Sequence, residues 1–212
     1  MRGLMVLAAL LGIPAVGSAD AAEPMPGPAV VVRFYRVASP AEEFSAARRL
    51  TAAILGEAGI AVSWSGCWPD AGAIAPGCQR PPGVNEVILH VVPARDANAL
   101  EHQHSLGFSL IDRGTATGTV ANVYADRIAA MAGGVGADRV CLLGRAIAHE
   151  IGHLLMGTNR HSARGLMRAL WSNRELKRDA PADWQFSDED AQTMRSLVEA
   201  RRLARRAYAS PL

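Results

Sequence analysis

The chain has 212 residues, a length that favours one compact domain, and half of its residues are hydrophobic, enough for a sizeable core. The formal net charge at pH 7 is +2, Lys177 is the only lysine, and the arginines are spread along the sequence. This near balance of charge excludes a strongly basic nucleic-acid-binding protein, so we expect no nucleic-acid partner.

The first 22 residues have the pattern of a secretory signal peptide. Arg2 supplies the positive charge, residues 4–16 are apolar, and small residues at 17–21 offer a cleavage site. The apolar run is short for a transmembrane helix, although an uncleaved anchor is an alternative. We therefore expect a signal peptide at 1–22 and one mature domain at 23–212. The domain is expected outside the cytoplasm, secreted or periplasmic, with no other membrane contact.

The mature chain is predicted to begin with a strand, a helix and a second strand. Residues 29–37 are rich in β-branched and aromatic side chains, which is typical of a strand. A helix follows from Pro40 to about Ala58, with Ser39 as its N-cap. Residues 60–64 are predicted to form the second strand.

The next segment, residues 65–85, is rich in glycine and proline and is predicted to be a loop. Cys67 and Cys78 flank it, and in an oxidising compartment we expect them to form a disulfide. Cys141 falls in a later helix and is expected to be a buried free thiol. The paired spacings of a cysteine-ligated zinc site are absent from the sequence.

Three more strands are predicted before the longest helix pattern. Residues 87–92 are almost all apolar, as in a central strand that is covered on both faces. Residues 106–111 and 119–124 are the other two. The glycines at 133–136 are interpreted as a flexible joint into the next helix, and not as a phosphate-binding loop, because no lysine follows them.

Three histidines in this region are interpreted as side chains without a metal. His90 lies inside the strand at 87–92, where a histidine with satisfied hydrogen bonds is the simpler interpretation. His102 and His104 have the spacing of one strand face and would suit a metal, but a solvated loop is the preferred interpretation.

The pattern from Asp138 to Gly157 predicts an amphipathic helix. Asp138 is a suitable N-cap, and Gly157 is a suitable residue to end the helix in the left-handed region. An apolar stripe recurs at helical spacing, at Leu143, Ile147, Ile151 and Leu154. We expect this stripe to be buried and the opposite side to face a cleft.

This helix carries the sequence H-E-x-x-H. His149 and His153 are four residues apart, so their imidazoles lie one turn apart on the same face and can bind one metal ion. Glu150 is rotated by about 100° from His149, which lets it reach a water on the metal without being a ligand. A catalytic zinc ion needs a third protein ligand and an open position for water.

A third histidine and a methionine follow the helix. His149, Glu150, His153, Gly157, His161, Ser162 and Met167 occur in this order. In that order they resemble the metzincin clan of zinc peptidases, the matrixins in particular. That family has the pattern H-E-x-x-H-x-x-G-x-x-H, often followed by serine and then by a methionine turn beneath the metal. The resemblance implies one catalytic Zn²⁺ held by His149, His153 and His161, with Glu150 as the catalytic base.

The spacing departs from the family pattern by two residues. Three residues, not two, separate His153 from Gly157, and three separate Gly157 from His161. In the strict register the third ligand would be Asn159, which is a poor ligand for zinc, so His161 is predicted instead. The thermolysin-like enzymes take their third ligand from a glutamate on a later helix, and Glu175 is the alternative at about that spacing.

The chain is predicted to end with a helix that is capped within residues 187–190. Its buried side is expected to contain Met194, Leu197, Val198 and Leu203. This order of elements resembles the metzincin fold over about residues 29–207. The expected fold class is therefore α+β and zincin-like: a twisted mixed sheet backed by helices, an active-site helix, and a small C-terminal subdomain with the methionine turn and the final helix.

The resemblance implies a secreted zinc metalloendopeptidase whose partner is a protein or peptide substrate. The strand at 106–111 would line the cleft and bind the substrate in an extended form. The alternative hypothesis is a non-catalytic zincin-like module that binds zinc and a partner; the presence of Glu150 counts against it. The sequence does not indicate the oligomeric state.

Overall fold

The computed structural model describes residues 27–67, 76–94, 105–112, 114–115 and 117–209. The predicted signal peptide, and both His102 and His104, lie outside these residues. No helix in the described part of the chain combines the length and the hydropathy that a membrane span requires.

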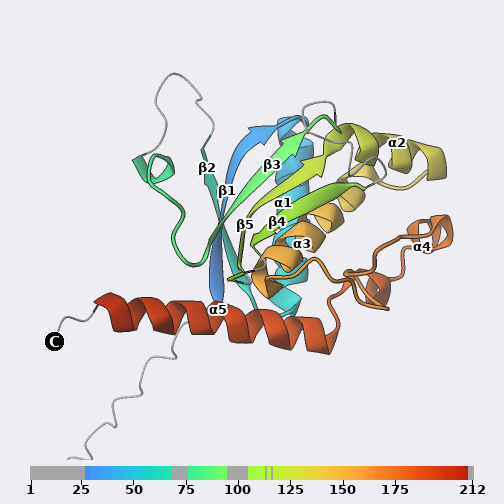
Figure 1. The fold of residues 1–212 in the computed structure, drawn as a ribbon. Coiled ribbons are helices and arrows are strands. Elements are labelled where there is room, and N and C mark those ends of the chain that lie inside the picture. Colours follow the sequence, from blue (N-terminus) through green and yellow to red (C-terminus); the bar gives the residue numbers. More distant parts are fainter. Residues whose placement is uncertain (1–26, 68–75, 95–104, 113, 116, 210–212) are drawn as a thin grey trace, which may run out of the picture.

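The core of the structure is a five-stranded mixed sheet with the strand order β2-β1-β3-β5-β4 (Figure 1). The strands are β1 (Ala29–Val37), β2 (Ala61–Gly66), β3 (Glu86–Val92), β4 (Gly107–Asp112) and β5 (Thr117–Tyr124). β4 is antiparallel to β5 and lies at one edge, and the other pairs are parallel. All five predicted strands are therefore present, and the mixed sheet is confirmed.

Helices cover one face of the sheet and one of its ends (Figure 1). α1 (Ala41–Glu57) and α3 (Arg139–Met156) pack side by side on the same face, and α5 (Asp188–Ala209) runs across the end of the sheet. The parallel pair β1 and β2 requires such a crossover helix between its strands. The predicted stripe on α3 is buried in the core, at Leu143, Ile147, Ile151 and Leu154.

The predicted disulfide between Cys67 and Cys78 is confirmed. It closes the loop after β2, which also covers Arg33 of β1. Arg33 is 2% exposed, forms an ion pair with Glu86 and donates to the main-chain oxygen of Arg80 at 2.9 Å. Cys141 is free, but it is half-buried and not fully buried as predicted, because it lies in the first turn of α3.

The predicted glycine joint is wrong, since Gly133 and Gly134 belong to a helix, α2 (Ala125–Val135). A helical glycine costs only about 1 kcal/mol, and burial of Ile128 and Ala132 against the core offsets that cost. Gly136 ends the helix with φ at 70°, a conformation that favours glycine.

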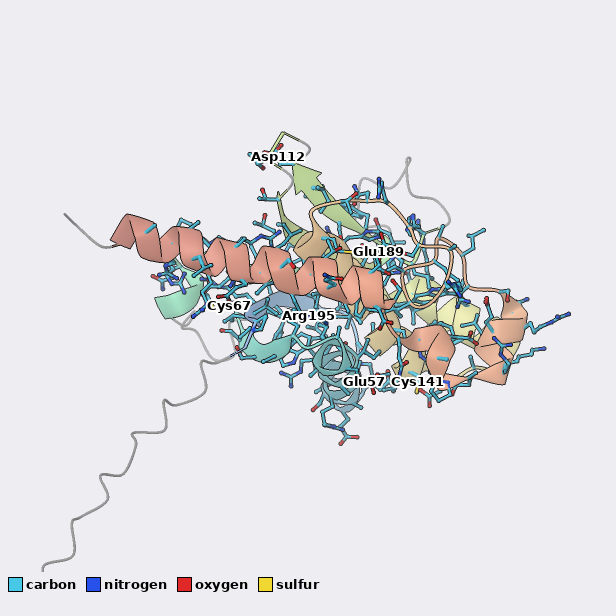
Figure 2. The ribbon with its side chains drawn as sticks, turned by 90° about the horizontal axis from the view of Figure 1, so that it is seen from below. Glu57, Cys67, Asp112, Cys141, Glu189 and Arg195 are labelled. Carbon is cyan, nitrogen blue, oxygen red and sulfur yellow. A yellow bond between two sulfur atoms is a disulfide. The ribbon has the colours of Figure 1, made fainter. Side chains whose placement is uncertain are left out.

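Two details of the flanking helices also differ from the prediction. The N-cap of α1 is Pro40, not Ser39, and it makes no side-chain capping hydrogen bond. Leu203 is 53% exposed because α5 continues past its last buried residue, Val198. Arg195 ties α5 to the end of α1 by donating to the main-chain oxygen of Ala58 at 2.8 Å (Figure 2).

Candidate active site

Two local signals fix the ends of α3, and both were predicted. The Asp138 side chain accepts a hydrogen bond from the main-chain nitrogen of Cys141 at 2.7 Å. Gly157 ends the helix in the left-handed region with φ at 62°. The helix thus presents His149 and His153 from its last two turns.

The imidazoles of His149 and His153 lie together, as the spacing predicts. Their ring centroids are 4.7 Å apart and their Nε2 atoms are 3.1 Å apart. Each Nδ1 contacts a main-chain carbonyl oxygen: that of Leu166 lies 2.9 Å from His149, and that of Thr158 lies 2.8 Å from His153. The two residues are only 8% and 4% exposed. Both rings are therefore fixed by a carbonyl contact and by the surrounding protein.

These contacts make the pair suitable for a cation. A carbonyl oxygen can only accept a hydrogen bond, so both Nδ1 atoms must carry the proton. Both Nε2 atoms, of His149 and of His153, then present lone pairs to each other across 3.1 Å. This contact is repulsive unless a cation lies between the two atoms, and a carbonyl behind each ring is the usual outer support of histidine ligands.

His161 completes the cluster from the loop that follows α3. Its ring centroid is 5.3 Å from that of His149 and 4.9 Å from that of His153. One nitrogen from each of the three rings lies within 4.8 Å of the others. Three neutral imidazoles in this arrangement fit one Zn²⁺ ion and leave a fourth position for water.

The alternative ligand, Glu175, lies outside this cluster. It is the third residue of α4 (Asn173–Arg178), where it forms a capping box with Ser172 and an ion pair with Arg168. Its carboxylate is therefore occupied by the helix end and by an arginine. The structure places His161, not Glu175, beside the two histidines of α3.

All three imidazoles are held in the neutral form. Burial lowers the pKa of His149 to about 3 and that of His153 to about 4, and the neighbouring imidazoles act in the same direction. Burial also lowers the pKa of His161. A metal ion binds only the unprotonated nitrogen, so the site is ready for a cation at neutral pH.

Met167 packs against α3 at Gly152. It is fully buried, and its Sδ lies only 2.9 Å from the point that a Cβ on Gly152 would occupy. Gly152 stands between the two histidines of α3, so the absence of a side chain there lets the methionine approach the helix. The family resemblance implies a methionine turn beneath the metal at Met167, and this stays a prediction.

The loop between His161 and Met167 is tied to the N-terminus of α5. Ser162 donates from its hydroxyl to the two carboxylate oxygens of Asp190, at 2.8 and 2.9 Å. The main-chain nitrogen of Ser162 also donates to the main-chain oxygen of Met167 at 2.8 Å. Asp190, which is buried and also bonded to Ser187, therefore fixes the loop that carries the third histidine.

Glu150 faces the edge strand β4. Its Oε2 accepts a hydrogen bond from the Ser109 hydroxyl at 2.7 Å, and the main-chain oxygen of Glu150 lies 2.8 Å from the same hydroxyl. Its Oε1 lies 2.9 Å from the point that a Cβ on Gly107 would occupy. Burial raises the pKa of Glu150 to about 7, although the Ser109 hydrogen bond lowers it in part.

The three histidines, Glu150 and Ser109 all line one cleft of about 730 Å³. One side is β4 with Ser105 and Leu106 before it, and the floor is formed by α3. The segment from Arg168 to Trp171 forms another wall of the cleft. The Trp171 ring lies edge-on to His149 at 5.7 Å, and its Nε1 donates to the main-chain oxygen of Leu166, as the His149 ring also does.

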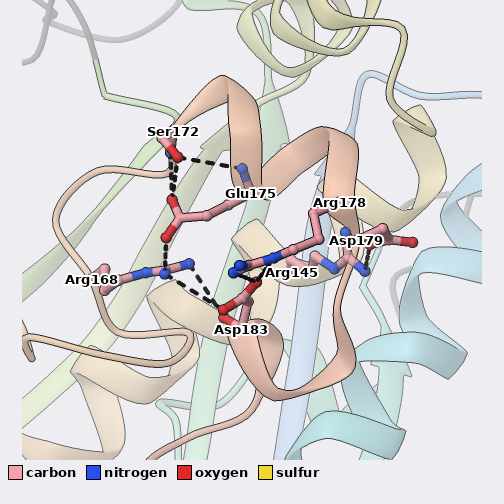
Figure 3. A network of polar contacts seen from close by, with 7 residues as sticks. All are labelled: Arg145, Arg168, Ser172, Glu175, Arg178, Asp179 and Asp183. Atoms are coloured by element: carbon pink, nitrogen blue, oxygen red, sulfur yellow. Dashed lines mark hydrogen bonds and ion pairs between the residues drawn. The ribbon is translucent and has the colours of Figure 1, made fainter.

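A network of ion pairs connects Arg168, at the start of this wall, to α4 and to the residues after α4 (Figure 3). Arg168 lies between Glu175 and Asp183, and Arg178 also pairs with Asp183. Trp184, whose ring lies 5.3 Å from that of Trp171, is covered by the guanidinium of Arg145 at 4.1 Å. The wall is thus braced against both α3 and α4.

The other expectations for this region were partly correct. His90 bonds to Asn122 at 3.2 Å between Nδ1 and Oδ1 and lies outside the histidine cluster, as predicted. Sequence reasoning missed Ser109, Gly107 and Asp190, whose roles depend on contacts between distant parts of the chain. The only signal at the first two was their place on a strand predicted to line the cleft.

The metal-free protein is expected to lose stability between about pH 6.5 and 4.5. The folded-state pKa values of His149 and His153 are depressed, so the unfolded chain binds two more protons there. Glu150 has the opposite sign, because its raised pKa leaves one extra proton on the folded state. For these three groups the unfolded chain binds one proton more than the folded chain, and the lowered pKa of His161 adds to this difference. The free energy of unfolding should therefore fall by at least about 1.4 kcal/mol per unit of decreasing pH.

Guanidinium unfolding of chelator-treated protein at several pH values in this range measures the slope. Glu150→Gln removes the opposing proton and should steepen the slope by about one proton, which is about 1.4 kcal/mol per pH unit. A stability that stays constant or rises on acidification would show that these groups are not buried in their neutral forms.

No family model and no curated protein matches the sequence. Among solved structures, the chain is similar to a zinc-dependent peptidase from Methanocorpusculum labreanum, at 18% identity and a TM-score of 0.47, over 77% of this chain and 99% of that one. It is also similar to archaemetzincin from Methanopyrus kandleri, at 14% identity and a TM-score of 0.46, over 82% and 97% of the two chains. Both similarities are remote, so the functional proposal is built on the site itself.

Proposed function

We propose that the protein is a zinc-dependent metalloendopeptidase of metzincin type. The observation that carries this proposal is the convergence of His149, His153 and His161 beside Glu150 in one cleft. A structural zinc site needs neither an open position nor a buried carboxylate next to it. The combination of three neutral imidazoles and a carboxylate is suited to hydrolysis.

When bound, zinc supplies a Lewis acid that polarises the scissile carbonyl and acidifies water. Glu150 takes the proton of the attacking water as general base. It then gives this proton to the leaving amine, so the carboxylate is restored at the end of the cycle. His149, His153 and His161 hold the ion, and the carbonyls of Leu166 and Thr158 keep two of these rings in the required tautomer.

The cleft supports an extended peptide as the substrate. β4 is an edge strand, paired only with β5 among the described residues, so its other side can pair with a substrate backbone. Cleft-lining residues run continuously from Ser105 to Ile111, which gives room on both sides of the scissile bond. This length favours internal cleavage of a protein or peptide over removal of one terminal residue.

We further propose that the enzyme acts outside the cytoplasm. Residues 1–22 have the pattern of a signal peptide. The disulfide between Cys67 and Cys78 supports the same location, because disulfides persist in oxidising compartments.

Metal analysis and a cleavage assay test this function together. The purified mature chain should contain about one zinc per molecule and should hydrolyse casein or a quenched peptide library. A chelator should abolish cleavage, and added Zn²⁺ should restore it. Zinc-dependent stability without any cleavage would instead support the non-catalytic zinc-binding module, and absence of zinc binding would overturn both.

A further inference from the structure

The hydroxyl of Ser109 is the feature of the cleft that the reaction as described above does not use. Ser109 lies on β4 and is only 6% exposed. Its side chain points to the helix face of the sheet, as do those of its neighbours in register, since Ser109 pairs with the fully buried Ala121. A buried hydroxyl needs a partner, and the partner here is Glu150.

The two oxygens of the Glu150 carboxylate have different surroundings. Oε2 is held by the Ser109 hydroxyl at 2.7 Å. Oε1 lies against Gly107, two residues earlier on the same strand, in space that any side chain at Gly107 would fill. Among the described residues no hydrogen bond to Oε1 is found, and both Glu150 and Gly107 line the cleft. One oxygen is thus anchored, and the other is left for a substrate or a water.

The Ser109 hydroxyl also stays satisfied when Glu150 has taken up a proton. It lies 2.8 Å from the main-chain oxygen of Glu150 as well as 2.7 Å from Oε2. With the carboxylate, the hydroxyl donates its single proton to Oε2. When Oε1 carries the proton of the carboxylic acid, the hydroxyl can still donate to Oε2, or turn its proton to the main-chain oxygen of Glu150. Neither state leaves the Ser109 hydroxyl without an acceptor.

We propose that Ser109 is a positioning residue that anchors Glu150 through Oε2, so that Oε1 faces the reacting water. This inference rests on the proposed hydrolytic function. Because Ser109 lies on the strand that also borders the substrate, it keeps the base in a fixed position relative to the bound peptide. An error of about 1 Å in such a position is enough to slow a reaction about 100-fold.

Kinetics of Ser109→Ala and Ser109→Thr test the role. Ser109→Ala should lower kcat by about 10- to 100-fold, leave KM within about twofold and leave the zinc content unchanged. Ser109→Thr keeps a hydroxyl on a β-branched side chain and should recover most of kcat. Ser63→Ala is the matched control, because Ser63 is also a strand serine but does not line the cleft, and its hydroxyl donates to the main-chain oxygen of Val30 at 3.5 Å. Its kinetics should match those of the parent protein.

A second measurement needs no activity. In the metal-free protein, Ser109→Ala should lower the equilibrium constant for folding by about tenfold when Glu150 is present. In the Glu150→Met background, where the hydroxyl has lost the carboxylate but keeps the main-chain oxygen of residue 150, the same change should have a clearly smaller effect. Equal effects in both backgrounds, or an unchanged kcat in Ser109→Ala, would overturn the proposal. An inactive parent protein would instead count against the hydrolytic function, and the unfolding cycle would still report on the Ser109 contact.

Discussion

Replacing Glu150 with glutamine is expected to reduce peptide hydrolysis by about 10²- to 10⁴-fold while zinc stays bound. Glutamine has the shape of glutamate and keeps an oxygen that can accept the hydrogen bond from Ser109, which is 2.7 Å long in the parent protein. It cannot take a proton from water at neutral pH. The substitution therefore removes the base and leaves the metal ligands in place.

The measurement is kcat on a quenched peptide, together with zinc content by mass spectrometry. Glu189→Gln is the matched control, because Glu189 is an exposed glutamate in the first turn of α5 (Figure 2) and does not line the cleft. Its activity should equal that of the parent protein. Undiminished cleavage by Glu150→Gln would remove Glu150 from the role of base, whereas a loss of zinc would show that the carboxylate supports the metal site.

The active-site helix was predictable because each of its signals is local. The Asp138 cap and the Gly157 end are set by neighbouring main-chain groups, and His149 and His153 share a face at any helix position with this spacing. These features do not depend on the rest of the fold. The strands were predictable for the same reason, since composition and turn residues within a few positions define them.

The third histidine was harder to predict because its position depends on a turn. Two residues more than in the family pattern lie between His153 and His161. One of them lies before Gly157, within α3, and the other lies after it. In that turn the main-chain oxygen of Thr158 accepts from the His153 ring, and the Thr158 hydroxyl accepts from the main-chain nitrogen of Arg160. The longer turn thus provides the outer support of one ligand, which spacing alone does not reveal.

Contacts between distant segments were not predictable from sequence patterns. Ser109 and Glu150 are 41 positions apart, and Ser162 and Asp190 are 28 positions apart. The first contact depends on the register of β4 in the sheet, and the second depends on where α5 packs. A local signal can also mislead. Gly133 and Gly134 predict a break in the helix, but α2 continues through them because its packing on the core outweighs the low helix propensity of glycine.

Replacing His161 with alanine is expected to weaken zinc binding by at least about 100-fold. Loss of a residue that merely supports a ligand already costs about 10- to 100-fold in metal affinity, and loss of a ligand should cost more. His149 and His153 would remain, since their rings are held by main-chain carbonyls that His161 does not contact. Competition with a chromophoric zinc chelator measures the affinity directly.

Glu175→Gln is the comparison that separates the two possible third ligands. Its carboxylate bonds to Ser172 and pairs with Arg168, so this change should lower the free energy of unfolding by about 1–3 kcal/mol. Zinc affinity should stay within about twofold of the parent value, because the Glu175 side chain lies outside the histidine cluster. The reverse result, with zinc retained by His161→Ala and lost by Glu175→Gln, would mean that the chain binds its metal through a glutamate on α4, as thermolysin-like enzymes do.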